Sequence, residues 1–272
     1  MQNINFTNLE IKNLDKDGFI IKKNILEFDQ IDKIKKIIKS NLEGKGTKDS
    51  HYPATLKSFA IKAVKFNFKK IFDSFYFFKI KKKLNLDSSA DIFFGKKSKL
   101  IMIDGYHNSI QNNEILPWHS DQAYSGAKTV KKINSPDLFS LKFFFYLTKA
   151  GSQNGCTSYI PGSHKITYAV RSCIYENIIS YKPFWSIKDL FDFILDHDNY
   201  NKIVHKLGTE TLLTDFLSKA KQVIENKDLN TFDFDASSGD LLIFNEGGLH
   251  KGSKPTKNER VVLRYLYSKS LN

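Results

Sequence analysis

Two histidines and one aspartate, far apart in the chain, constrain its fold more than any other feature. His119 and Asp121 form a His-x-Asp pair, and His250 follows 129 positions after Asp121. This is the ligand set of a two-histidine, one-carboxylate iron site. If the three side chains share one metal, the fold must bring these two distant segments together.

Local geometry supports a shared site. Side chains at positions i and i+2 of a strand lie on one face, so His119 and Asp121 are predicted to point the same way from a strand end. His250 would complete the site from another strand or from the glycine turn that precedes it. Three ligands leave other metal positions open. Zinc remains an alternative metal, with Glu246 as the nominal base of a zinc hydrolase.

Arginine is rare in this sequence, with Arg171, Arg260 and Arg264 among 42 basic residues. Arg260 and Arg264 are four positions apart on a predicted strand and should share one face. A buried guanidinium needs an anionic ligand or an acidic partner. The alternative is that Glu259 or another acid pairs with these arginines at the surface.

The hydrophobic pattern predicts one domain over residues 1–272, in which helices surround a β core. Residues 15–21 are predicted to form a turn that enters a short strand. Predicted helices are 25–38, 54–84, 187–195 and 209–226, and predicted strands are 100–103, 139–148, 157–160, 240–245 and 261–267. The helical insertion at about 166–230 is interpreted as a substrate lid, and its Arg171 suggests a substrate anion.

The composition is strongly basic, with a net charge of +13 and a pI near 9.4. Lysines are spread along the chain, which favours a solvated surface over a specific nucleic-acid interface. A basic nucleic-acid or membrane adaptor is the alternative. Two cysteines make no disulfide framework, and neither a signal peptide nor a transmembrane segment is visible. A cytoplasmic location is expected.

At this point the sequence resembles the phytanoyl-CoA dioxygenase family of iron(II)- and 2-oxoglutarate-dependent oxygenases. Four stretches carry the likeness in order along the chain. They are Leu14–Ile20, Trp118–Gln122 with its Trp-His-x-Asp motif, Asn154–Lys165 with Pro-Gly-Ser-His-Lys, and Ser238 through His250 to Arg260.

The resemblance implies a double-stranded β-helix, a cupin-like jelly roll of mainly β (α+β) class with helices outside. It implies Fe(II) on His119, Asp121 and His250, and Arg260 on the distal carboxylate of 2-oxoglutarate. Arg264 is the fallback, because Arg260 follows the histidine more closely than is usual and Lys251 interrupts the usual His-Gly-Ser run. His164, by resemblance, is a structural turn residue.

The implied reaction uses O₂ and 2-oxoglutarate and releases succinate and CO₂. Because Asp121 is retained where halogenating relatives carry a small residue, hydroxylation of a small, anionic substrate is expected. Trp118, Lys142 and Thr157 or Ser158 are predicted to approach the cosubstrate, with strand parity open by one residue. A non-catalytic barrel that binds a small molecule or metal is the alternative.

Overall fold

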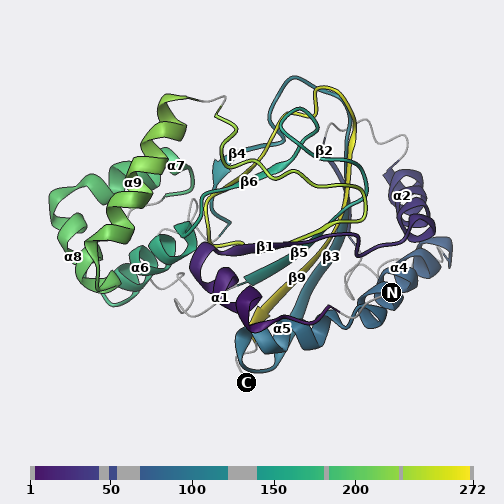
Figure 1. The fold of residues 1–272 in the computed structure, drawn as a ribbon, viewed down its shortest axis with the longest axis horizontal. Coiled ribbons are helices and arrows are strands. Elements are labelled where there is room, and N and C mark those ends of the chain that lie inside the picture. The colour runs from purple at the N-terminus through teal and green to yellow at the C-terminus, as the bar shows by residue number, and fades with distance from the viewer. Residues whose placement is uncertain are drawn as a thin grey trace.

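Two antiparallel sheets form the centre of the computed structural model, which describes residues 4–42, 49–53, 68–121, 140–180, 184–226 and 229–269 (Figure 1). The larger sheet has the strand order β1 (Phe19–Lys22), β7 (Leu241–Asn245), β5 (Ser140–Tyr146), β9 (Arg260–Lys269), β3 (Ser98–Asn108) and β2 (Asp49–Pro53). The smaller sheet has the order β4 (Leu116–His119), β8 (His250–Gly252) and β6 (Thr157–Tyr159). This jelly-roll core with helices outside confirms the predicted fold class.

Strand β9 shows how the larger sheet separates two environments. Its side chains alternate between faces. Val261, Leu263 and Tyr265 belong to the apolar core that packs against the N-terminal helices, whereas Val262 belongs to the core inside the barrel. Both faces are therefore buried, which explains why the central strands are apolar runs rather than alternating patterns.

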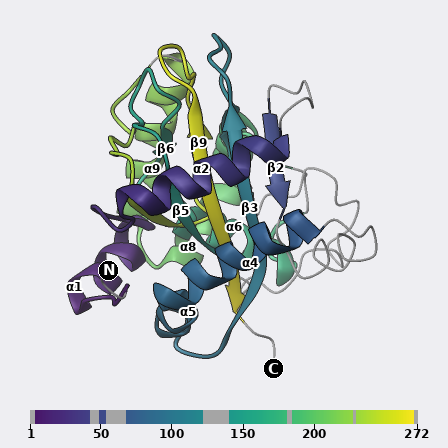
Figure 2. The ribbon, with the colours of Figure 1, turned by 90° about the vertical axis from the view of Figure 1, so that its right-hand side faces the viewer.

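Helices α1 (Asn8–Asp17), α2 (Phe28–Leu42), α4 (Phe68–Lys83) and α5 (Leu86–Phe94) form the predicted N-terminal layer. Figure 2 shows α2 and α4 crossing the outer face of the larger sheet. Ile34, Ile38 and Phe77 are fully buried in that interface. Residues 54–67 of the predicted 54–84 helix lie outside the described residues.

Helix α1 corrects the prediction of a turn at residues 15–17. The helix begins after Thr7, whose side chain accepts a hydrogen bond from the Glu10 amide in a capping box, and it ends at Gly18 with φ of 87°. The Thr-x-x-Glu spacing was the available signal. It was missed because only Leu14 of this helix is buried, so the apolar pattern is weak. Helix α5 and strand β2 were also not predicted.

The insertion contains α6 (Ser163–Tyr175), α7 (Ile187–Leu195), α8 (His197–Leu207) and α9 (Glu210–Glu225), which lie together beside the barrel (Figure 1). The prediction for α7 is confirmed, and the predicted 209–226 helix includes the two cap residues of α9. These helices share a second apolar core. Among the described helices, none has the length and apolarity needed to cross a membrane.

Candidate metal centre

Strand pairing brings the three predicted ligands together. His119 at the end of β4 is the direct partner of His250 at the start of β8. Asp121 follows in a turn rather than on the strand, which corrects the expected geometry, and its side chain still reaches both imidazoles. One donor atom from each residue lies within 4.8 Å of the others. The Asp121 oxygens are 3.4 Å from His119 Nε2 and 3.3 Å from His250 Nε2.

Backbone carbonyls orient both imidazoles. His119 Nδ1 donates to the carbonyl of Pro117 at 2.6 Å, and His250 Nδ1 donates to that of Gly248 at 2.9 Å. These bonds fix the tautomers and leave each Nε2 lone pair available to a metal. Burial lowers the pKa of His250 to about 4, with smaller effects from Lys142 and His119. The imidazole is therefore neutral near pH 7, as a metal ligand must be.

Lys142 faces the carboxylate of Asp121. Burial alone would raise the pKa of Asp121, but the Lys142 ammonium and the two histidines outweigh it and hold that pKa well below its ordinary value. Asp121 thus offers an anionic oxygen beside the two imidazole nitrogens. This donor set suits iron(II), and zinc is chemically compatible with it.

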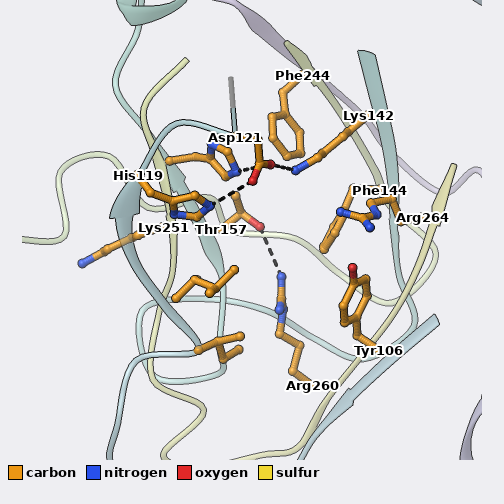
Figure 3. A pocket seen from close by; sticks show the side chains of 14 residues that line it. Tyr106, His119, Asp121, Lys142, Phe144, Thr157, Phe244, Lys251, Arg260 and Arg264 are labelled. Carbon is orange, nitrogen blue, oxygen red and sulfur yellow. Dashed lines mark hydrogen bonds and ion pairs between the residues drawn. The ribbon is translucent and has the colours of Figure 1, made fainter. Parts of the chain in front are cut away.

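A cavity of about 100 Å³ opens beside these ligands, between the two sheets (Figure 3). Four cations line it, and Asp121 is the acid among its described lining residues. The full lining is Tyr106, Ile115, Leu116, His119, Asp121, Lys142, Phe144, Thr157, Phe244, His250, Lys251, Gly252, Arg260 and Arg264. Lys142 pairs with Asp121, Arg264 with Asp104 and Lys251 with Glu114, so Arg260 is the lining cation that favours an anionic ligand.

The two arginines on β9 have different environments. Arg264 forms two bonds to Asp104, from Nε at 2.8 Å and from Nη2 at 2.6 Å. Arg260 is 5% exposed and has no acidic partner among the described residues. Its polar contacts are long hydrogen bonds to Asn108 and Thr157, at 3.4 Å each. Its Nε has no hydrogen-bond partner among the described residues.

The alternative that Glu259 or another acid pairs with the arginines is wrong for Glu259, which pairs with Lys39 and His107, but another acid, the buried Asp104, does pair with Arg264. Arg260 instead stacks on Phe144, with 5.0 Å from Cζ to the ring centroid. Gly155 has φ of 67°, and a Cβ there would lie 3.0 Å from Arg260 Cδ. The Asn-Gly pair therefore leaves room for the arginine stem, which gives that motif a local physical role.

The remaining predicted contacts divide into two groups. Lys142 and Thr157 line the cavity. Trp118 does not, and this corrects its assignment: it neighbours His119 on β4, and its indole packs in the apolar core of the insertion, 6.3 Å from the Phe232 ring centroid. Adjacent residues of a strand face opposite sides, so Trp118 and His119 could not both face the metal.

Arg171, which suggested a substrate anion, lies away from these ligands, and that role stays a prediction. It lies in α6, is 3% exposed, and is not among the residues that line the cavity. His164 is likewise separate from the ligands: its Nε2 donates to the carbonyl of Asp15 at 3.0 Å, consistent with the structural role implied by resemblance.

Sequence reasoning missed Asp104 and Tyr106, which pack around Arg264. The predicted strand ended at residue 103, whereas β3 continues to Asn108. Trp185 of the insertion stacks on His119 with a centroid distance of 5.0 Å and an interplanar angle of 26°.

Comparison with known sequences decides the family. The profile described as phytanoyl-CoA dioxygenase (PhyH) matches residues 14–260. The chain belongs to the phytanoyl-CoA dioxygenase family. This is a family of iron(II)- and 2-oxoglutarate-dependent oxygenases, and membership confirms the resemblance seen in the motifs. No curated protein matches the chain by sequence.

Solved structures share the fold of this phytanoyl-CoA dioxygenase family member at low identity. HygX from Streptomyces hygroscopicus, with nickel and 2-oxoglutarate bound, is 12% identical with a TM-score of 0.58, covering 98% of this chain and 88% of its own. The carbocyclase SnoK from nogalamycin biosynthesis is 12% identical with a TM-score of 0.60, covering 97% and 85%. AviO1 from Streptomyces viridochromogenes Tue57 is 14% identical with a TM-score of 0.54, covering 97% and 95%.

Proposed function

We propose that this protein is an iron(II)- and 2-oxoglutarate-dependent dioxygenase that hydroxylates a small organic substrate. The observation that carries the proposal is Arg260, a buried guanidinium without an acidic partner among the described residues, in the same cavity as His119, Asp121 and His250. Burying a cation without an anionic partner costs free energy, which a bound anion would offset. The distal carboxylate of 2-oxoglutarate would do so.

The residues present fit both groups. Two imidazoles and one carboxylate would hold iron(II) on one face and leave the positions toward the cavity for ligands. Arg260 would bind a carboxylate through its fork, with the Thr157 hydroxyl beside it. Bound iron(II) and 2-oxoglutarate would supply oxygen activation and the oxidative decarboxylation that yields succinate and CO₂.

The protein's own contribution is position and exclusion of water. Phe144 and Phe244 line the cavity between the cations, and Ile115 and Leu116 line it from the smaller sheet. These apolar walls shield the site and would strengthen the interaction between Arg260 and a carboxylate. The arrangement requires no separate general base, and Glu246 is engaged by Lys142 at 3.6 Å.

Hydroxylation is favoured among the outcomes open to this family because Asp121 occupies the position at which halogenating relatives have a small residue. The anionic substrate that Arg171 suggested stays a prediction, and Arg171 is not among the residues that line this cavity. The cytoplasmic location and the role of the insertion as a substrate lid stay predictions.

Uncoupled turnover tests the proposal without knowledge of the substrate. Purified protein with Fe(II), 2-oxoglutarate and O₂ should release succinate slowly, and a panel of anionic and neutral small molecules should be screened for acceleration. His119→Ala and Asp121→Ala should each abolish succinate release. Full activity in either variant would refute the site.

A further inference from the structure

We propose that Lys142 is a positioning residue for the metal, holding Asp121 so that this carboxylate meets the metal through one oxygen. The inference rests on the proposed metal site and adds a residue to it. Each of the three ligands would then have one dedicated partner. For His119 and His250 these are the carbonyls of Pro117 and Gly248.

Asp121 is the ligand most in need of such a partner. It lies beyond the end of β4, and its side chain is 34% exposed, against 2% for His119 and 7% for His250. Each imidazole is held by a carbonyl only two residues away. Asp121 is instead held from across the barrel, because the Lys142 ammonium donates to its Oδ2 from strand β5.

The Lys142 side chain is itself fixed by strand β7. Lys142 is the direct partner of Phe244, and Glu246 follows β7 in a turn. The ammonium is 5.4 Å from the Phe244 ring centroid and 3.6 Å from Glu246 Oε2. With 5% of its side chain exposed, Lys142 has little freedom to move. Glu246 would still balance the ammonium when Asp121 binds a metal.

The direction of approach separates a positioning role from competition with the metal. In Figure 3 His119 reaches Asp121 from one side, and Lys142 reaches it from the other. A metal held between the imidazoles and the carboxylate would therefore not displace the ammonium. Oδ2 accepts from Lys142 and also lies 3.3 Å from His250 Nε2, whereas Oδ1 lies 3.4 Å from His119 Nε2 and has no ammonium on it. We therefore expect Oδ1 to be the oxygen that binds the metal. The positions toward the cavity then stay open.

Cobalt(II) binding tests this inference without turnover. Titration is followed by calorimetry and by the visible spectrum, which reports the coordination of the ion. Lys142→Met should weaken cobalt binding by about 10- to 100-fold, the usual loss when a partner of a metal ligand is removed, and should alter the spectrum. Lys142→Arg keeps the charge and the donor and should restore both within a few-fold.

Two further variants complete the test. Lys142→Gln, a smaller change, should give an intermediate loss and serves if Lys142→Met does not fold, as judged by thermal unfolding without metal. Glu246→Gln removes the second carboxylate near Lys142 but leaves the bond to Asp121 in place, so it should weaken cobalt binding less than Lys142→Met does. Wild-type affinity and spectrum in the Met or Gln variant, or tighter binding, would overturn the inference.

A control separates this inference from the proposed site. His250→Ala should abolish cobalt binding at the site in the otherwise wild-type protein. If wild-type protein does not bind cobalt, or if His250→Ala binds it equally well, the proposed metal site itself fails. If those controls hold and the Lys142 variants match wild type, Lys142 alone is misassigned.

Discussion

Arg264 and Asp104 form a two-bond ion pair between the neighbouring strands β9 and β3, with nitrogen–oxygen distances of 2.8 and 2.6 Å. Four residues earlier on the same face, Arg260 has no such acid among the described residues. The protein therefore supplies the anionic partner of Arg264, whereas Arg260 is available to an anionic ligand. This difference separates the effects expected from two similar substitutions.

Arg260→Met should remove cosubstrate binding while the protein stays folded. Two charge-assisted hydrogen bonds to a carboxylate would be lost, and each contributes about 1.5–3 kcal/mol. We expect the Kd for 2-oxoglutarate to rise by roughly 100-fold or more, measured by calorimetry on nickel-loaded protein. Arg260→Lys keeps the charge without the planar guanidinium, so its Kd for 2-oxoglutarate should lie between those of wild type and the Met variant. An unchanged Kd in the Met variant would contradict the assignment.

Arg264→Met should instead reduce stability. It leaves the carboxylate of Asp104, a residue 1% exposed, as an uncompensated buried charge. Breaking a buried pair in this way costs about 3–5 kcal/mol in the free energy of unfolding, measurable by urea denaturation. Adding Asp104→Asn should recover part of the loss. Equal stability of the single variant and wild type would argue against a structural pair.

Trp185 should report metal binding by fluorescence. The chain has two tryptophans, so Trp118→Phe leaves Trp185, stacked on His119, as the sole indole. Saturating cobalt(II) should quench its emission in that variant. Adding His250→Ala removes a ligand and keeps the stacked pair, so quenching should disappear. If cobalt does not change the emission of Trp185 in Trp118→Phe, the metal binds elsewhere.

His164 should make stability depend on pH. Burial lowers the pKa of His164 from 6.5 to about 4, because the charged form is disfavoured. The unfolded chain then binds the proton more readily, so the free energy of unfolding falls as pH drops from 6.5 toward 4. The contribution of this one group is on the order of 3 kcal/mol.

This effect should be measured on the metal-free protein. His250 also has its pKa lowered to about 4, and a metal bound to it would add a pH dependence of its own. Urea unfolding at several pH values should show a shallower slope for His164→Gln than for wild type. A slope identical to that of wild type would mean that His164 does not titrate in this window.

The family and the three candidate ligands could be predicted because each motif is a short run of neighbouring residues. The residues that contact those ligands and the arginines depend instead on strand pairing across the barrel. Trp118 was misassigned by one strand position, which reverses the face. Asp104 was missed because the apolar pattern of β3 ends before the strand does. Asp121, which Lys142 contacts, follows a strand of the other sheet in a turn, and no spacing in the sequence encodes that contact.

The predicted lid is also joined to the ligand strand through its backbone. His119 forms an isolated β-bridge with Ser186, the N-cap of α7, and the Ser120 amide donates to the carbonyl of Trp185 at 3.2 Å. A molecule that displaces α7 would therefore pull on the segment that carries an imidazole ligand. A substrate that binds to the insertion would therefore affect the position of His119 through these backbone contacts, even where that substrate lies at a distance from the cavity.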